Sequence, residues 1–197
     1  MNILILGPQG SGKGTQAKRI ADEYGLPHVA TGDMFRAAIA ERTPLGLQVE
    51  PILASGQLVP DEFTIALIRE RLSRDDAHAG FVLDGFPRNL AQAEALDDLL
   101  AELRRPLDVI FDFQIADDVC VDRLLKRAEA EGRSDDTPDV IAERLRIYHE
   151  QTEPLIEHYL ATGSVVGIHA GRSIEEVWAE IQAALEQAAR TGTAAAT

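Results

Sequence analysis

Cysteine is nearly absent from this chain of 197 residues, since Cys120 is the only one. A single cysteine excludes an intrachain disulfide and any zinc site built from several thiolates. Because Cys120 stands between Val119 and Val121, it is more typical of a small core residue than of a nucleophile. Histidine is also sparse and shows no metal-ligand spacing, so we expect structural or surface roles. The histidines are His28, His78, His149, His158 and His169.

Positive charge and long apolar runs are scarce as well. The net charge of -14 argues against a surface for nucleic acid or acidic membranes. No apolar run approaches the ~18 residues of a transmembrane helix. Met1-Asn2 leads directly into the apolar run Ile3–Leu6, without the charged segment and apolar core of a secretion signal. These absences predict a soluble, cytoplasmic protein that binds neither nucleic acid nor membrane.

Regular alternation of apolar and helical segments predicts the fold class. Hydrophobic residues make up 45% of the chain, which suits one globular domain. Apolar runs typical of buried parallel strands occur at Asn2–Leu6, His28–Ala30, Gly80–Leu83, Leu107–Phe113 and Ser164–His169. Helical segments lie between them, at 14–24, 31–41, 61–73, 89–104, 117–130, 138–161 and 173–190. This rhythm predicts an α/β, doubly wound parallel sheet of five strands, flanked by helices on both faces.

Two segments depart from the alternation. From Thr31 to about residue 73 there are helical patterns broken by prolines and no strand, which predicts a small helical lobe inserted between strands. Residues 127–138 form a short polar loop between two long helices, with Thr137 and Pro138 suited to cap the second helix. The Ala/Thr/Gly-rich tail at 188–197 is expected to fray.

A glycine-rich loop follows the first predicted strand, with the sequence Gly7-Pro8-Gln9-Gly10-Ser11-Gly12-Lys13-Gly14-Thr15. Gly7, four residues and then Gly12-Lys13 form the frame of a P-loop, whose backbone N–H groups cradle phosphates. The helix that follows adds its dipole, and Lys13 would reach the outer phosphates. Gly14 occupies the usual Ser/Thr position, and Thr15 comes one place later. The alternative is an ordinary glycine-rich turn between a strand and a helix. The order of strand, glycine-rich loop, lysine and helix favours the P-loop over that alternative.

Several separated arginines could converge on one crevice, because a guanidinium group binds phosphate oxygens bidentately. They are Arg36, Arg88, Arg123, Arg127, Arg133 and Arg144. For most of them a surface ion pair is the simpler alternative. Arg88 is the exception, because Asp84-Gly85-Phe86-Pro87-Arg88 follows the end of a predicted strand, where ligands bind in such sheets. Asp84 could hold Mg²⁺ directly or through water, or cap the turn.

Four segments together resemble the adenylate kinases: Gly7–Thr15, Thr31–Arg36, Phe81–Arg88 and Arg133–Asp136. The match runs from Met1 to about Ala189, and its Asp-Gly-Phe-Pro-Arg block is highly specific for nucleoside monophosphate kinases. The resemblance implies ATP + AMP ⇌ 2 ADP with Mg²⁺. It also implies one P-loop kinase domain at 1–190, in which a core (1–29, 60–125, 138–190) carries an NMP-binding lobe (30–59) and a short lid (126–137), followed by a flexible tail (191–197).

The same resemblance implies a role for each matching residue. Phosphates of ATP would contact Arg127 and the loop residues Gly10, Ser11, Gly12, Lys13, Gly14 and Thr15, and the adenine of ATP would contact Arg123 and the backbone at Arg172. AMP would be held by Thr31, Arg36, Gln57, Leu58, Val59, Gly85, Phe86, Pro87, Arg88, Gln92, Arg133 and Arg144. The catalytic cations would be Lys13, Arg88, Arg123, Arg127, Arg133 and Arg144. Asp135 and Asp136 would support a closed lid by pairing with arginines.

Three alternatives remain beside this reading. The related UMP/CMP kinases usually carry Ala at the Thr31 position and Asn at the Gln92 position, so Thr31 and Gln92 favour adenine as the acceptor base. Asn89, directly after Arg88, instead resembles the residue of the pyrimidine enzymes at that position. A GTP-binding switch would normally show an Asn-Lys-x-Asp run, which is absent. An inactive scaffold would have no reason to keep the arginines.

The short lid excludes the zinc-containing long-lid form, and a monomer is expected.

Overall fold

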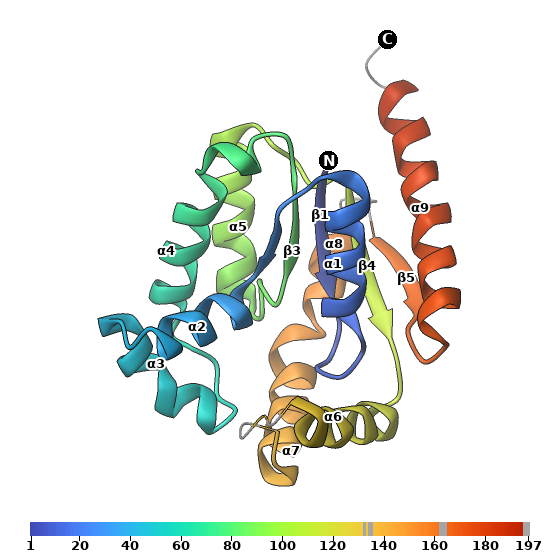
Figure 1. The fold of residues 1–197 in the computed structure, drawn as a ribbon. Coiled ribbons are helices and arrows are strands. Elements are labelled where there is room, and N and C mark those ends of the chain that lie inside the picture. Colours follow the sequence, from blue (N-terminus) through green and yellow to red (C-terminus); the bar gives the residue numbers. More distant parts are fainter. Residues whose placement is uncertain (132, 134–135, 162–164, 195–197) are drawn as a thin grey trace.

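The computed structural model of the chain describes residues 1–131, 133, 136–161 and 165–194, and Figure 1 shows its fold. Some expectations from the sequence lie outside the described residues. They are the pairing of Asp135 with arginines, the start of the last strand at Ser164 and the end of the tail at 195–197.

A five-stranded sheet forms the centre of the molecule, with the order β2-β3-β1-β4-β5 and every neighbouring pair parallel. The strands are β1 (Asn2–Leu6), β2 (His28–Ala30), β3 (Phe81–Asp84), β4 (Val109–Gln114) and β5 (Val165–His169). The inner strands β1, β3 and β4 are buried at almost every residue, as continuous apolar runs require when both faces of a sheet are covered. The predicted doubly wound α/β sheet is confirmed.

Helices cover both faces of this sheet (Figure 1). They are α1 (Lys13–Tyr24), α2 (Thr31–Ala40), α3 (Pro44–Ala54), α4 (Asp61–Leu72), α5 (Leu90–Leu103), α6 (Asp117–Glu131), α7 (Pro138–Ile147), α8 (Leu155–Leu160) and α9 (Ile174–Ala194). On one face α1 and α9 pack Ile20 and Ile181 into the core. On the other face α4, α5 and α8 contribute Ile68, Leu96 and Leu155. In the described part of the chain, no helix combines the length and apolar composition needed to cross a bilayer.

Helices α2 and α3 form a small lobe between β2 and β3, where the sequence predicts one. Their apolar side chains gather around Phe35, Val49 and Val59, in a cluster separate from the two that cover the sheet. The lobe starts at Thr31, directly after β2. Helix α4 then returns the chain to the sheet, because Ile68 belongs to the main core. The lobe is therefore attached to the sheet through both of its ends.

The long helix expected at 138–161 is interrupted in the structure. A π-helical turn, Tyr148–Thr152, follows α7, and α8 begins directly after Pro154. Proline has no N–H to continue the ladder of helical hydrogen bonds, so the regular helix cannot run through this point unchanged. The hydroxyl of Thr152 donates a hydrogen bond to the carbonyl oxygen of Arg88 at 2.7 Å. The interruption therefore ties this helical segment to the loop that follows β3.

Candidate active site

Three neighbouring strands end side by side at one edge of the sheet. Asp84, the last residue of β3, pairs with Ile5 of β1 and with Ala30 of β2. The chain therefore leaves adjacent points of the edge into the glycine-rich loop, into Thr31 and into Gly85. The carboxyl edge of a parallel α/β sheet is where such folds bind their ligands.

The glycine-rich loop at 7–15 makes a tight turn in which Gly7, Gly10 and Gly12 all have a positive φ. Gly10 has a φ of 86°, and a Cβ there would lie 2.7 Å from the carbonyl oxygen of Cys120 on α6. Gly12 caps the N-terminus of α1 with a φ of 90°. The first turn of α1 follows at once, and the N–H groups of a first helical turn have no acceptor within their own helix. The loop thus has the geometry of an anion cradle at a helix N-terminus.

Lys13 and Asp84 lie together beside this loop. The Lys13 ammonium group donates to the carbonyl oxygen of Pro8 at 2.8 Å. Burial lowers the pKa of Lys13 to about 8, although the Asp84 carboxylate opposes the shift. Burial also disfavours the charged form of Asp84, but the His28 ring, 3.5 Å away, and Lys13 hold the pKa of Asp84 below its usual range. The pair is therefore charged at neutral pH, next to Gly14, whose Cβ would lie 3.6 Å from the Asp84 carboxylate.

The carbonyl oxygen of Gly85 joins two of the residues predicted to bind AMP. The Thr31 hydroxyl and the Nε of Arg88 each donate a hydrogen bond to it at 2.8 Å. Among the described residues, the forked Nη end of Arg88 has no carboxylate partner. A half-buried guanidinium group held in this way is suited to a bound anion.

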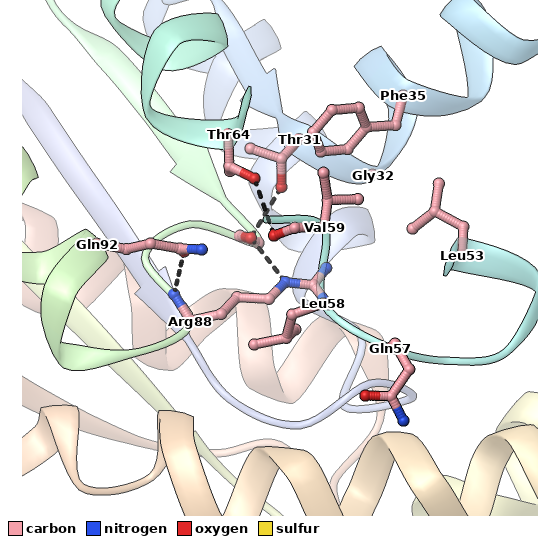
Figure 2. Close-up of a pocket in the computed structure, with 11 residues that line it drawn as sticks. Thr31, Gly32, Phe35, Leu53, Gln57, Leu58, Val59, Thr64, Arg88 and Gln92 are labelled. Carbon is pink, nitrogen blue, oxygen red and sulfur yellow. Dashed lines mark hydrogen bonds between the residues drawn. The ribbon is translucent and has the colours of Figure 1, made fainter. Parts of the chain in front are cut away.

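Figure 2 shows the pocket that lies between the lobe and the loop after β3. Its lining residues are Thr31, Gly32, Phe35, Leu53, Gln57, Leu58, Val59, Thr64, Gly85, Arg88 and Gln92. The structure therefore brings together most of the residues predicted for the AMP site, from the lobe and from the loop after β3. Arg88 points from the loop towards the lobe, with its guanidinium group beside Leu58.

Some residues predicted for the AMP site lie outside this lining. Arg36 pairs with Asp33, and its side chain is 42% exposed. Its guanidinium group still borders the pocket, because a Cβ at Gly32 would lie 3.2 Å from it. Phe86 is buried in the core against the sheet, and the peptide bond that joins it to Pro87 is cis. Phe86 and Pro87 are both buried, and neither lines the pocket.

Sequence reasoning missed four lining residues: Gly32, Phe35, Leu53 and Thr64. Phe35 lies one helical turn after Thr31, so the helical period could have found it. Leu53 on α3 and Thr64 on α4 reach the pocket only because the lobe folds over the loop after β3, and no sequence signal marks them.

Asp136 is the centre of an arginine cluster between α6 and α7. Its side chain has no exposed surface, and it accepts hydrogen bonds from Arg127 at 2.8 and 2.9 Å and from Arg144 at 2.8 Å. The Nε of Arg133 lies 3.6 Å from the same carboxylate. The pairing expected of Asp136 is thus present, and three predicted catalytic arginines are gathered around one anion.

Helix α7 also contacts the lobe. The Nε2 of Gln57 donates to Glu143 at 2.6 Å, and Arg144 donates to the carbonyl oxygen of Leu53 at 3.4 Å. A Cβ at Gly56 would lie only 3.1 Å from the side chain of Val140. The arginine cluster and the pocket are therefore neighbours across this contact.

Arg123 on α6 lies between the loop at 7–15 and the segment after β5. It donates to the carbonyl oxygens of Ala170 at 3.0 Å, Ser11 at 3.4 Å and Arg172 at 3.4 Å. The hydroxyl oxygen of Ser11 is buried and has no hydrogen-bond partner among the described residues. The structure thus brings together Ser11, Arg123 and Arg172, which were predicted to contact ATP.

The charges of these groups are close enough to affect one another. Burial is the main reason that the pKa of Lys13 is lowered, and the positive charges of Arg88 and Arg127 lower it further. Burial also lowers the pKa of Arg88, with smaller contributions in the same direction from Arg144 and Arg36. The cations predicted from separate parts of the sequence therefore converge on one region.

A magnesium ion fits this region only together with a nucleotide. Within the described residues, no group of three or more His, Cys, Asp or Glu side chains is arranged to hold a metal ion. Asp84 offers an ionised oxygen ligand, which Mg²⁺ prefers, and phosphate oxygens and water would have to supply the other ligands. Cys120 takes no part, because it is fully buried beside Leu124 and burial raises the pKa of its thiol to about 11.

The fold and this edge of the sheet define a class of protein. A parallel sheet whose first strand runs into a P-loop, with an adjoining pocket that contains a half-buried arginine, is the arrangement of a P-loop phosphotransferase. Comparison with known proteins gives the family. The family model described as adenylate kinase matches residues 5–164.

Curated relatives named adenylate kinase cover nearly the whole chain. The protein from Cyanothece sp. (strain PCC 7425 / ATCC 29141) is 47% identical over 185 residues, 94% of this chain and 95% of its own length. The one from Geobacillus sp. (strain WCH70) is 44% identical over 92% of this chain and 97% of its own length. The one from Stenotrophomonas maltophilia (strain R551-3) is 41% identical over 94% and 100%. The chain belongs to the adenylate kinase family, which confirms the family and the class of activity predicted from its motifs.

Proposed function

We propose that this chain transfers the terminal phosphoryl group of MgATP reversibly to AMP, giving two ADP. In the forward direction an AMP phosphate oxygen bonds to the γ-phosphorus of ATP while the bond from that phosphorus to the β–γ bridging oxygen breaks. One observation carries the proposal. Residues 84–88 begin beside the loop that contains Lys13 and end at Arg88 in the pocket. One turn of the chain therefore connects the proposed ATP site with the proposed AMP site.

On the donor side, the backbone N–H groups of residues 10–15 would cradle the ATP phosphates and Lys13 would neutralise them. Arg123 and the backbone of Arg172 would flank the adenine, and Arg127 would meet the phosphates. The hydrogen bonds from Arg123 to the carbonyl oxygens of Ser11 and Arg172 support this assignment, because they link the two segments involved.

On the acceptor side, Arg88 would hold the AMP phosphate, while Thr31, Gln92 and the backbone of residues 57–59 would enclose the base. Arg36 would turn from Asp33 to the phosphate. Its present ion pair is exposed, and such pairs contribute only about 0–1 kcal/mol, so exchanging it for a phosphate costs little.

No side chain has to act as a general base, because a phosphate oxygen of AMP attacks as an anion. The transition state spreads negative charge over the transferring group, and fixed cations stabilise that charge. The cations that would do so are Lys13, Arg88, Arg123, Arg127, Arg133 and Arg144. Their mutual effects on the pKa values of Lys13 and Arg88 support a shared site.

The proposal includes the movement of two parts of the chain. The lobe at 30–59 would close over AMP and the lid at 126–137 over ATP, against a core of 1–29, 60–125 and 138–190. Helix α9 continues to Ala194, so residues 191–194 are helical and do not form the tail expected from the sequence. Closure would exclude water and so suppress hydrolysis of ATP. The separate apolar cluster of the lobe supports this division.

Mg²⁺, when bound with ATP, would neutralise charge on the phosphate oxygens. Asp84 would hold the ion directly or through water, since its carboxylate is ionised beside the loop. The proposal further includes a cytoplasmic monomer without nucleic-acid or membrane partners. The net charge of -14 supports the exclusion of nucleic acid.

The test is an assay of ADP formation from ATP, with AMP, CMP, UMP and GMP offered as acceptors. AMP should give the highest kcat/KM, and removal of Mg²⁺ should abolish the reaction. A dinucleotide that bridges both sites should compete with ATP and with AMP. Preference for CMP would instead support a UMP/CMP kinase, and slow hydrolysis of GTP without transfer would contradict both.

A further inference from the structure

Gln92, the pocket residue expected to contact the acceptor base, is held by partners on two sides. The residue is only 1% exposed. Its Oε1 accepts a hydrogen bond from the backbone N–H of Arg88 at 2.8 Å, and its Nε2 donates to Oδ1 of Asp61 at 2.7 Å. Asp61 is the first residue of α4, whereas Gln92 lies on α5. Figure 2 shows the first of these bonds, with Gln92 at the edge of the pocket.

Both partners permit only one orientation of the Gln92 carboxamide. A carboxylate only accepts hydrogen bonds, and a backbone N–H only donates them. Turning the amide over would place its nitrogen against the N–H of Arg88 and its oxygen against the carboxylate of Asp61. Two hydrogen bonds would become two repulsive contacts at a buried side chain, where unpaired polar groups are costly.

Asn89 fixes the carboxylate of Asp61 in turn. The Nδ2 of Asn89 donates to the same Oδ1 of Asp61 at 2.9 Å, and its Oδ1 accepts from the backbone N–H of Gln92 as the N-cap of α5. The carboxamide of Asn89 is thus used to start the helix and to orient Asp61. The presence of Asn89, as in the pyrimidine enzymes, therefore does not indicate which base is bound.

We propose that Asp61 is a positioning residue for acceptor specificity, which makes the Gln92 amide recognise adenine and reject hypoxanthine and guanine. This inference rests on the proposed function. An amide has two donor hydrogens and two acceptor lone pairs, and Asp61 and Arg88 occupy one of each. The remaining donor and acceptor match the ring nitrogen and the amino group of adenine. Hypoxanthine and guanine present a ring N–H and a carbonyl oxygen at these places, so they require the opposite orientation of the amide.

The experiment compares Asp61→Asn with Glu62→Gln. Each variant removes one carboxylate from the first turn of α4, so charge and helix-dipole effects are matched. The side chain of Glu62 is exposed, and no hydrogen bond or ion pair links that side chain to another described residue. The amide introduced by Asp61→Asn could donate as well as accept, so it would no longer oppose an inverted Gln92 amide. The readouts are kcat and KM for AMP, for IMP (the hypoxanthine nucleotide) and for ATP.

For Asp61→Asn we expect the ratio of kcat/KM for AMP to that for IMP to fall about tenfold, through a higher KM for AMP, with the KM for ATP unchanged. Glu62→Gln should stay within about twofold of wild type in every readout. Asp61→Glu, which keeps a group that only accepts, should retain the wild-type ratio even if the KM for AMP rises. An Asp61→Asn ratio equal to wild type overturns the inference, and so does an equal fall in Asp61→Glu.

If Asp61→Asn does not fold, Asp61→Ser carries the same expectation, because a hydroxyl also donates or accepts and suits the start of a helix. Circular dichroism spectra of each variant establish that it is folded. A wild-type enzyme that forms no ADP from ATP and AMP would contradict the proposed function itself. That outcome is separate from a wild-type enzyme that does so while its Asp61 variants keep their preference for AMP over IMP.

Discussion

The Nη1 of Arg144 lies 2.8 Å from Oδ1 of Asp136, a carboxylate with no exposed surface that also accepts from Arg127. Replacing Asp136 by Ala would remove the anion that holds these guanidinium groups together. We expect Asp136→Ala to lower the free energy of unfolding by about 2 kcal/mol, measured by urea denaturation. Asp139→Ala removes an exposed acid from the first turn of α7 and should change it by less than about 0.5 kcal/mol. Equal losses in both variants would contradict a central role for Asp136.

Arg88 should matter most for turnover, because its forked end meets no carboxylate among the described residues and reaches into the pocket. We expect Arg88→Ala to reduce kcat for ATP plus AMP about 100-fold or more, through lost stabilisation of the transferring group. Arg69→Ala is the control, since Arg69 forms an exposed pair with Glu102 at 2.6 Å. A fall of less than about tenfold in Arg88→Ala, roughly 1.4 kcal/mol, would remove Arg88 from the catalytic set.

The pKa of Lys13 predicts how the affinity for ATP depends on pH. This pKa is lowered to about 8 by burial, against the opposing Asp84 carboxylate, and bound phosphates would raise it again. Below about pH 8 the Lys13 ammonium group is already charged before ATP binds. Above that pH the neutral Lys13 amine has to take up a proton when ATP binds. The Kd for ATP should therefore rise above about pH 8, by up to about tenfold per pH unit. Calorimetric titration of ATP at several pH values measures this rise.

Lys13→Met should bind ATP more weakly at neutral pH and lose the rise in Kd above about pH 8, because no ammonium group remains to be charged. Lys18→Met is the matched control, since Lys18 is exposed on the same helix and should leave the profile unchanged. A near-normal kcat in Lys13→Met would show that this lysine does not serve the transferred phosphate.

Gly10 tests the shape of the phosphate loop. An alanine there would need a φ of 86° and would put its Cβ 2.7 Å from the carbonyl oxygen of Cys120. Gly25 also has a positive φ, 64°, but nothing lies within 4 Å of its Cβ position. Gly25→Ala should therefore cost about 1 kcal/mol of unfolding free energy, and Gly10→Ala clearly more. Gly10→Ala should also weaken ATP binding, whereas Gly25→Ala should not. Equal effects on stability and on ATP affinity would contradict a tight loop.

The strands and the order of helices were predictable because each depends on local pattern. The inner strands read as continuous apolar runs, and β1 matches its predicted bounds of Asn2–Leu6. The helix expected at 138–161 was less well predicted. Its apolar period continues through Pro154, but the structure inserts a π-helical turn before that residue. Bounds are set by backbone hydrogen bonds that a side-chain period does not specify.

The residues of the candidate site were also predictable only in part. The glycine-rich loop, Thr31 and Arg88 could be identified because each follows the end of a strand, and parallel strands bring such ends to one edge of the sheet. Leu53 and Thr64 could not be identified, because they reach the pocket from α3 and α4 only after the lobe folds.

By itself the sequence determined the class of fold, the phosphate loop, the residues after each strand and the family. These features depend on short motifs and on the alternation of apolar segments, which act over a few residues at a time. Only the tertiary structure decided which cations meet and how polar groups pair, as in the carboxylate of Asp136 among its arginines and that of Asp61 on the Gln92 amide. Such pairs join residues on different elements, and their contacts exist only when those elements pack together.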